Sequence, residues 1–321
     1  MDQPPDLGEI YALAAPALGR QLEQYRESAN RYQRKSKAEA TWHGYNCVWR
    51  LAQRFALVHD VCALPMATDT ARALFSDMAD KGYSSSYINQ MAVVLRHVHR
   101  WSSAPDPLID PDVIDTLKGV KRVAGERPVK RKWAIQPDEL ALLADVDDKQ
   151  ERCALLLCFA AALRRKELVA LDPEDVEITA EGALITVGKS KTDQQSRGAE
   201  LFIERGTRMC PIRALEEWLA VRGTDPGPLF YNQKRGTTPR HRLSDRTVAR
   251  WIQRGAKRIG LNPKDFGGHS MRSGCATALI VAGVADPQIL AHTRHASIDS
   301  LAPYFRPRGK MRVNLTAALD L

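Results

Sequence analysis

A short basic segment divides this chain into two parts and limits how it can fold. Residues 118–132 hold seven lysines and arginines against one acid, and they include the helix-breaking residues Gly119, Gly125 and Pro128. Glycine and proline are unfavourable inside a helix, so we expect a linker, placed at residues 119–132, rather than one continuous helix. The 321 residues are enough for a domain on each side of it.

The residues before the linker have the pattern of a small helical domain. We assign residues 1–34 to a polar N-terminal lead with a short helix near Ile10–Glu27, and residues 35–118 to the domain itself. Apolar residues recur three and four positions apart, which is the spacing of one helix face. The predicted helices are Thr41–Val58, Thr68–Lys81, Ser84–Trp101 and Pro111–Leu117.

Residues 133–321 predict a second domain of mixed structure. Gly182–Val187 and Ala199–Ile203 alternate in polarity and contain β-branched residues, so we expect two strands joined by a turn. Arg152–Leu163 is almost continuously apolar, which indicates a buried helix. Further helices are predicted at Pro211–Arg222, Ser244–Ile259, 270–282, 286–293, 297–304 and Val313–Leu319. The predicted fold class is therefore mainly α with a small antiparallel β-sheet.

The net charge of +9 is unevenly distributed. Residues 1–125 carry 15 Lys and Arg against 14 Asp and Glu, whereas residues 126–321 carry 32 against 24. A basic domain attracts polyanions, nucleic acid first among them, although charge also serves solubility. There is no membrane-length apolar run and no signal-peptide pattern, so we expect a cytoplasmic, nucleoid-associated protein that binds no membrane.

The six cysteines have no metal-binding or disulfide pattern, because no two are spaced as Cys-x-x-Cys. We expect buried free thiols, with neither a zinc site nor a disulfide framework. The sequence also shows no Walker loop and no carboxylate metal cluster. The expected chemistry therefore uses no metal and no cofactor.

Two arginines are candidates for gripping a phosphate. Arg164 lies at the end of the predicted buried helix, with Glu167 three residues on as a supporting carboxylate. Arg272 follows His269 by three residues in Gly-Gly-His-Ser-Met-Arg, and this spacing points both side chains at one spot. Two guanidiniums aimed at the equatorial oxygens stabilise the transition state of phosphoryl transfer. Taken singly, Arg164 fits a surface salt bridge better, and His269 and Arg272 fit a helix cap and a surface arginine equally well.

Three further residues supply the remaining chemistry for a phosphodiester. Tyr304 is the candidate nucleophile, because a phenol is readily displaced in the return step. Lys191, on the predicted turn, is the candidate acid for the leaving alkoxide. His295, nine residues before Tyr304, can hydrogen-bond a phosphate oxygen or orient the tyrosine. A buried aromatic anchor, a solvated turn lysine and a helix-end histidine are the alternatives.

A basic stretch, Lys234–Arg258, contains nine lysines and arginines against one acid, Asp245. Arg246, Arg250 and Arg254 recur every fourth residue and form one stripe of a helix suited to the DNA major groove. A solvated basic face is the alternative, and the near absence of acids weakens it. The other candidate DNA-binding residues are Arg242, Lys189 on the turn, and Lys130, Arg131 and Lys132 in the linker.

This set of motifs resembles the tyrosine recombinases, the family of phage integrases, Xer and Cre proteins. Ala-Leu-Arg-Arg-Lys-Glu-Leu resembles their first-arginine box, Gly-Lys-Ser-Lys-Thr their hairpin lysine, and His-Ser-Met-Arg their His-x-x-Arg box. The step from His295 to Tyr304 matches their nucleophile spacing. The resemblance covers about residues 35–321, and it departs at Ala162 and Arg294, where the family often has glycine.

The resemblance implies a helical, SAM-like core-binding domain and a mixed α/β catalytic domain that form a clamp on DNA. It implies strand exchange through a 3′-phosphotyrosine on double-stranded DNA with inverted-repeat sites, performed by a homo-tetramer on two sites. Val313–Leu319 would dock into a neighbouring subunit, and Arg246, Ala249 and Arg250 would read bases. A type IB topoisomerase, a telomere resolvase and a non-catalytic DNA-binding regulator are alternative functions.

Overall fold

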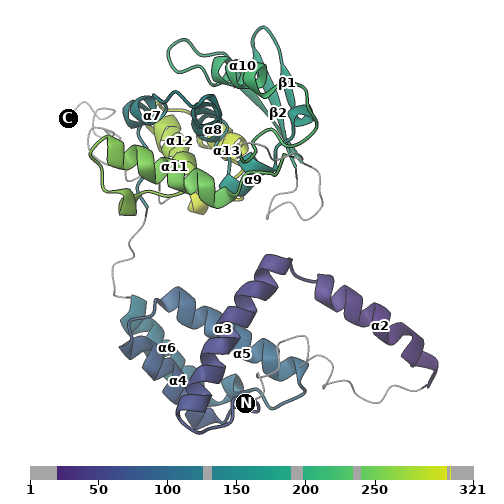
Figure 1. Cartoon of the computed structure of the whole chain (residues 1–321). Helices are drawn as coiled ribbons and strands as arrows, with labels where there is room; N and C mark the ends of the chain where they lie inside the picture. Colours follow the sequence, from purple (N-terminus) through teal and green to yellow (C-terminus); the bar gives the residue numbers. More distant parts are fainter. Residues whose placement is uncertain (1–19, 126–131, 189–197, 234–239, 302–303, 305–321) are drawn as a thin grey trace. The chain divides into compact units, whose positions relative to one another are not determined.

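The computed structural model describes residues 20–125, 132–188, 198–233, 240–301 and 304. The chain forms two compact units, with the boundary between Val129 and Lys130 (Figure 1). In the described part, no helix combines the length and the apolar character needed to span a membrane.

Unit 1 is helical in its described residues. The hydrophobic core lies between the helices, where Leu74, Phe75, Ile88, Met91 and Leu95 are almost completely buried. Ser84 caps one helix by accepting a hydrogen bond from the Tyr87 backbone N–H. The elements are α2 (Arg20–Lys35), α3 (Glu39–Val58), α4 (Thr68–Asp80), α5 (Ser85–Trp101), the short 3-10 helix η1 (Pro107–Ile109) and α6 (Pro111–Gly125).

The last helix of unit 1 is longer than predicted. The sequence pattern ends it at Leu117, but α6 continues through Gly119 to Gly125, so residues 119–125 are helical and the predicted linker is too long. Packing outweighs the cost of the two glycines, because Val113 and Ala124 are buried at opposite ends of the helix. Helix α2 also ends later than predicted, because it extends beyond Glu27 and past the assigned end of the lead at residue 34.

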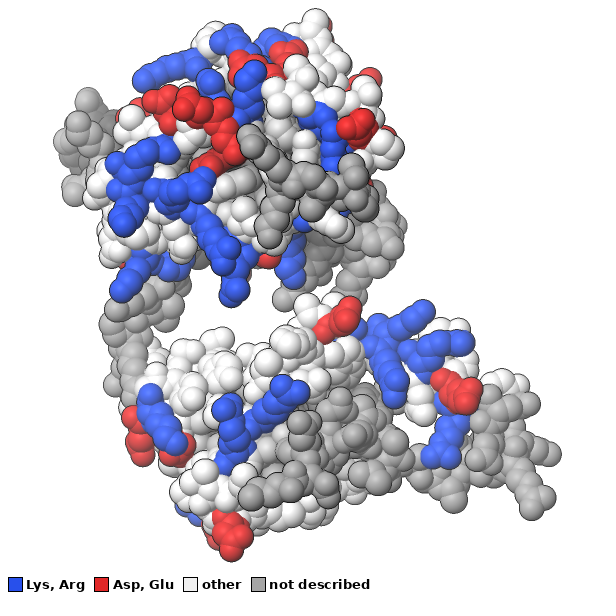
Figure 2. Space-filling view, viewed as in Figure 1, with Lys and Arg blue, Asp and Glu red and all other residues white. Residues whose placement is uncertain are grey.

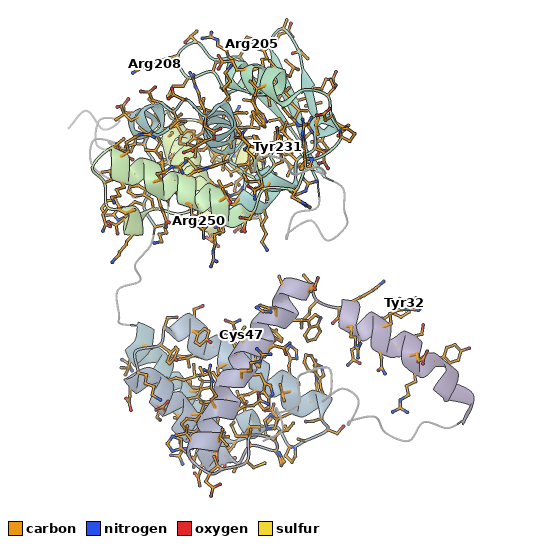
Figure 3. All side chains as sticks on the ribbon, viewed as in Figure 1. Tyr32, Cys47, Arg205, Arg208, Tyr231 and Arg250 are labelled. Carbon is orange, nitrogen blue, oxygen red and sulfur yellow. The ribbon has the colours of Figure 1, made fainter. Side chains whose placement is uncertain are left out.

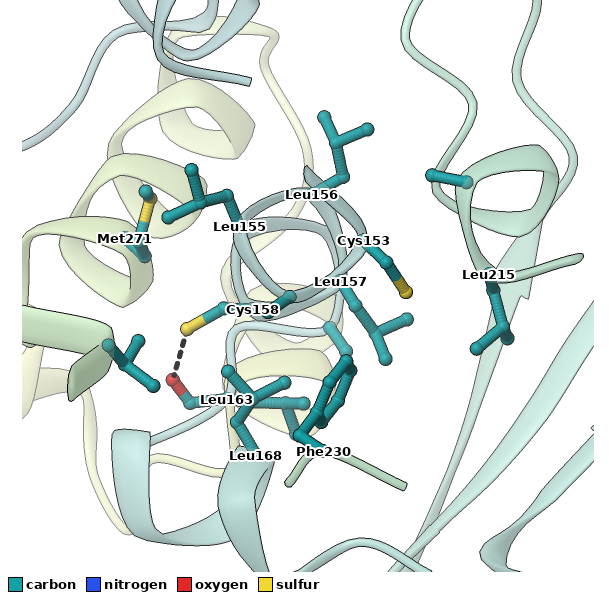
Figure 4. Close-up of a cluster of buried hydrophobic side chains, with 14 of the residues drawn as sticks. Cys153, Leu155, Leu156, Leu157, Cys158, Leu163, Leu168, Leu215, Phe230 and Met271 are labelled. Atoms are coloured by element: carbon teal, nitrogen blue, oxygen red, sulfur yellow. Dashed lines mark hydrogen bonds between the residues drawn. The ribbon is translucent and has the colours of Figure 1, made fainter. Parts of the chain in front are cut away.

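Unit 2 is built around the buried helix α8 (Lys149–Ala160), which α10 (Pro211–Arg222) and α12 (Ser270–Val281) contact. Figure 4 shows Leu155 and Leu157 of α8 inside the apolar cluster, where both are fully buried. This confirms the predicted buried helix. The other helices are α7 (Pro137–Leu143), α9 (Arg165–Ala170), α11 (Asp245–Arg258) and α13 (Asp286–Thr293), with 3-10 helices η2 (Pro173–Asp175), η3 (Pro263–Asp265) and η4 (Ile298–Ser300).

A three-stranded antiparallel sheet completes unit 2, in the order β1 (Val176–Ile178), β2 (Gly182–Val187) and β3 (Ala199–Glu204). The central Ile185 lies opposite Val176 on one side and Leu201 on the other. Both predicted strands are confirmed. The sequence pattern missed β1, because three residues are too few to show alternation. A mainly helical fold with a small antiparallel sheet agrees with the predicted class.

All six cysteines are free thiols. Cys153, Cys158, Cys210 and Cys275 are buried, as predicted, whereas Cys47 and Cys62 are exposed. The prediction of burial is therefore wrong for the two cysteines of unit 1.

Two helical glycines give a matched test of the extended α6. A side chain at the exposed Gly119 would meet nothing within 4 Å, whereas a Cβ at Gly274 in α12 would lie 2.3 Å from the carbonyl oxygen of Ile135. We expect Gly119→Ala to raise the free energy of unfolding of unit 1 by about 0.5–1 kcal/mol. We expect Gly274→Ala to lower that of unit 2 by about 1–3 kcal/mol. Hydrogen exchange measured at increasing denaturant gives the free energy of unfolding of each unit separately. A lower value for unit 1 in Gly119→Ala would argue against a helix at residues 119–125.

Candidate active site

The structure brings the predicted phosphate-binding and nucleophilic residues together in unit 2. Arg164 is the N-cap of α9, and Glu167 lies in the first turn of that helix. His269 is the N-cap residue of α12, and Arg272 lies in its first turn. His295 follows α13, and Tyr304 follows η4. The predicted acid Lys191 lies outside the described residues.

The Arg164–Glu167 pair joins a half-buried guanidinium to a buried carboxylate and is not a surface salt bridge. The Glu167 carboxylate accepts the Arg164 backbone N–H at 2.8 Å and its guanidinium at 2.5 Å. The Glu167 side chain is 5% exposed and that of Arg164 is 29% exposed. The predicted position at the end of a buried helix is wrong, because α8 ends at Ala160 and Arg164 begins the next helix.

Glu167 is ionised at neutral pH despite its burial. Burial alone would raise the pKa of this carboxyl group, but hydrogen bonds from the backbone and side chain of Arg164, together with the charge of Arg294, lower the pKa below its ordinary value. The carboxylate therefore has a full negative charge with which to hold Arg164.

Arg272 is a buried cation, and the surface alternative for it is wrong. The residue is 1% exposed, and its guanidinium donates to the Ala162 carbonyl oxygen at 2.8 Å and to the Arg294 carbonyl oxygen at 3.3 Å. Burial, followed by repulsion from Arg164 and Arg294, lowers its pKa to about 10. Arg272 therefore keeps its charge at neutral pH, and its electrostatic coupling to Arg164 places two cations at one site.

Tyr304 lies beside His269. The tyrosine Oη and His269 Nε2 are 2.9 Å apart, which is hydrogen-bond distance. Burial, then Arg272 and Arg164, lower the pKa of His269, so its ring is neutral at pH 7 and can accept the phenolic proton. Tyr304 also packs against the small apolar cluster of Ile280, Ile289 and Leu301. The two interpretations of Tyr304, a buried aromatic anchor and a candidate nucleophile, are therefore compatible.

His295 is held in one tautomer by Thr293. The Thr293 hydroxyl donates to the Ile289 carbonyl oxygen at 2.6 Å, so its oxygen accepts from His295 Nδ1, also at 2.6 Å. Nε2 of the neutral ring is then unprotonated, and the ring centroid lies 5.6 Å from that of Tyr304. Burial, then Arg272 and Arg164, lower the pKa of His295 to about 4.

Arg294 was noted in the sequence only as a departure from glycine, and its place in the site was missed. Its guanidinium donates to Glu167 Oε2 at 3.0 Å and to the carbonyl oxygens of Ala162, Ala161 and His292 at 3.1–3.2 Å. Its backbone is left-handed, with φ of 55°. The available signal was the residue type itself, since arginine rarely replaces glycine at such a position.

The basic helix α11 has one buried apolar face and one exposed cationic face. Val248, Trp251 and Ile252 are buried against the core of unit 2. Arg246 and Arg250 are exposed and have no hydrogen-bond or ion-pair partner among the described residues. Figure 2 shows lysines and arginines gathered over this helix, and Figure 3 labels Arg250 on its outer side.

Other predicted DNA-binding residues have protein partners. Arg242 donates to the carbonyl oxygens of Val169 and Ala170 at 2.9 and 2.7 Å and pairs with Asp172 at 2.7 Å. Arg254 pairs with the buried Glu151, so only Arg246 and Arg250 of the predicted stripe are without a partner among the described residues. Lys132 donates to the Lys264 carbonyl oxygen. Ala249 is half-buried on α11, and Lys130, Arg131 and Lys189 lie outside the described residues.

Comparisons with known proteins agree with this fold and residue pattern. The model of the phage integrase family matches residues 134–310. The chain is 30% identical over 280 residues to an integrase/recombinase XerD homologue of Selenomonas ruminantium, covering 84% of this chain and 82% of that protein. It is 23% identical over 299 residues to the recombinase Cre of Escherichia phage P1, covering 85% of each. In fold it is similar to a lambda integrase tetramer bound to a Holliday junction, with a TM-score of 0.62 and 20% identity, covering 90% of this chain and 78% of that one.

These similarities identify the chain as a DNA recombination enzyme of the tyrosine type. The chain belongs to the phage integrase family, the tyrosine recombinases.

Variants of Arg242 and Arg250 compare an arginine that hydrogen-bonds within the fold with an exposed arginine. Arg242→Ala leaves the carbonyl groups at the end of α9 without their donor, so we expect a loss of about 1–3 kcal/mol in the free energy of unfolding. Arg250→Ala should change it by no more than about 0.5 kcal/mol. Denaturant titration of the two variants beside the parent chain measures both values. Equal values for the two variants would contradict the distinction.

Proposed function

We propose that this recombinase cuts and rejoins DNA at specific sites through a 3′-phosphotyrosyl intermediate, with Tyr304 as the nucleophile. The observation that carries the proposal is the 2.9 Å contact between the Tyr304 hydroxyl group and His269, beside the buried Arg272. A tyrosine held this way has an acceptor for its proton and cations for the phosphate that it attacks.

The reaction proceeds in two balanced transfers. In the first, Tyr304 gives its proton to the neutral His269 and its oxygen attacks the phosphorus, which forms the P–O bond to the enzyme and breaks the bond to the DNA 5′ oxygen. Lys191 is the proposed donor of the proton that the leaving 5′ oxygen takes up. In the second, the 5′ hydroxyl group of another strand gives its proton to the now neutral Lys191 and attacks the phosphotyrosine. The bond between phosphorus and Tyr304 breaks, and the tyrosine oxygen takes its proton back from His269. The energy of the phosphodiester is conserved in the intermediate.

Arg164 and Arg272 are the proposed clamp on the non-bridging phosphate oxygens. Guanidiniums present two parallel donors to a phosphate and stay charged throughout. Removal of one such donor from a water-excluded site costs about a hundred- to a thousandfold in rate in other enzymes. Glu167 holds Arg164 from behind, and His295 is proposed to assist at the phosphate or at the tyrosine.

Double-stranded DNA with inverted-repeat sites is the proposed substrate, and a homo-tetramer on two sites is the proposed assembly. The exposed cations of α11, Arg246 and Arg250, support DNA binding by unit 2, which we propose as the catalytic domain, with Ala249 as a further base reader. Unit 1 is proposed as the core-binding domain. Lambda integrase, which has a similar fold, forms a tetramer on a Holliday junction, and this supports the proposed assembly. Val313–Leu319, outside the described residues, is the proposed docking helix.

The covalent step is tested by replacing Tyr304. Tyr304→Phe removes the attacking oxygen and keeps the ring, so we expect no covalent protein–DNA adduct on a nicked cognate site, with DNA affinity within about twofold of the parent. Denaturing gel electrophoresis detects the adduct and a mobility shift the affinity. An adduct formed by Tyr304→Phe would disprove the assignment, and a parent chain that forms none on its own site would favour a DNA-binding regulator. Relaxation of supercoiled DNA without a site would indicate a type IB topoisomerase, and hairpin products a telomere resolvase.

The exposed face of α11 is tested by two charge removals. The double variant Arg246→Ala and Arg250→Ala should weaken DNA binding and reduce the slope of log affinity against log salt by up to about two. Arg208→Ala is the matched control, since Arg208 is also exposed without a partner among the described residues and lies on the other side of unit 2 in Figure 3. An equal effect per charge removed, with half the change in slope for the single control, would assign the affinity to net charge and not to α11.

A further inference from the structure

Two loops of the candidate site contain residues with left-handed backbone that are not glycine. Ala162, just before Arg164, has φ of 45°, and Arg294, just before His295, has φ of 55°. Such backbone costs a non-glycine residue about 1 kcal/mol, and it persists where the surrounding contacts impose it. Both strained residues therefore lie next to residues with proposed roles in catalysis.

The side chain of Arg294 supplies contacts that tie the two loops together. Its guanidinium donates to the Ala161 and Ala162 carbonyl oxygens of the first loop and to the Glu167 carboxylate in α9. The side chain is 11% exposed, so these bonds form in a largely water-free setting. A glycine would relieve the backbone at this position, but it could make none of these bonds.

The backbone of Arg294 adds a second link. Its carbonyl oxygen accepts from Arg272, whose guanidinium also donates to Ala162. The Ala162 carbonyl oxygen therefore accepts from Arg272 and from Arg294, and the loops carrying Arg164 and His295 are joined by both arginines.

We propose that Arg294 is a positioning residue of the strand-exchange site: it clamps the loop that carries Arg164 to the loop that carries His295 and directs the Glu167 carboxylate at Arg164. The inference rests on the proposed function, because it assigns Arg294 to support of the phosphate-binding groups. Both terminal nitrogens of Arg294 donate to protein acceptors, and its Nε is buried without a partner among the described residues. The guanidinium is therefore not itself placed on the phosphate.

The clamp also sets the charge balance of the site. The groups that face Glu167 are Arg164 of α9, Arg272 of α12, Cys158 of α8 and Arg294. Removal of the Arg294 charge takes away one cause that lowers the pKa of Glu167, so this pKa rises.

The same removal acts on His295. The charged or titratable groups facing it are Arg272, Arg164, His269, Arg294 and Tyr304, and after burial the first four lower its pKa. Without the Arg294 cation, the pKa of His295 rises from its value of about 4. Protonation of either Glu167 or His295 then begins at a higher pH.

Arg294→Gly tests the clamp, because glycine accepts the left-handed backbone without strain while all the guanidinium contacts are lost. We expect the rate constant of adduct formation on a nicked site, measured with protein in excess, to fall about ten- to a hundredfold while DNA affinity stays within about twofold. The acid limb of the pH–rate profile should move to higher pH. Arg294→Lys retains the charge and should restore part of the rate and most of the profile, while Arg294→Ala should behave as Arg294→Gly. A misfolded fraction lowers only the concentration of active protein. At saturating protein it therefore leaves the rate constant and the pH profile unchanged.

An activity-independent measurement keeps this test separate from that of the proposed function. The His295 ring is titrated by NMR in the free, full-length protein, where Arg294→Gly should raise its pKa above about 4. A parent chain without adduct would refute the covalent mechanism, and the NMR titration would still report on the clamp. An Arg294→Gly variant with the parent rate constant, the parent pH profile and an unchanged His295 pKa would overturn the inference.

Discussion

The buried carboxylate of Glu167 is the interaction on which the rest of the candidate site depends. It is the one anion of the described site, and it lies between the guanidiniums of Arg164 and Arg294, with Arg272 nearby. Like charges at close range repel by about 4 kcal/mol per pair at 4 Å and an effective dielectric constant of 20. Loss of one partner of a buried ion pair typically costs about 3–5 kcal/mol. Glu167 thus allows several arginines to stay charged in a site that water reaches poorly.

The fold supplies this arrangement through the end of one buried helix. Because α8 is apolar on all sides from Cys153 onward, it is fixed within the core, and its end at Ala160 is fixed with it. The left-handed Ala162 then turns the chain so that Arg164 can begin α9 and Glu167 can cap it. The Ala162 carbonyl oxygen, left outside the helix, accepts from both Arg272 and Arg294. The last carbonyl groups of a helix have no partner within the helix, and here the chain just after α8 uses such a group to accept from Arg272 and Arg294.

Much of this follows from sequence, and the exceptions have physical reasons. The spacing of His269 and Arg272 and the apolar run of α8 predict their positions, because helical periodicity is a local property. The extension of α6 through Gly119 depends on packing, which outweighs propensity. The pairing of Arg254 with Glu151 joins residues far apart in the chain, so a helical stripe of arginines alone gives no sign of it. Arg294 was visible only as an odd residue, because its role comes from contacts with a loop more than a hundred positions away.

The protonation states of the site are linked to its occupancy. Burial first, and then repulsion of a protonated ring by the arginines, hold the pKa values of His269 and His295 down, and this repulsion exists in full when no anion is present. A phosphodiester bound between Arg164 and Arg272, as proposed, brings a negative charge that offsets it, so binding raises both histidine pKa values. By linkage, protons then favour binding to the same extent. His269 is thus a better proton acceptor once the phosphate is in place than in the free protein, which ties the proposed activation of Tyr304 to the presence of a bound phosphate.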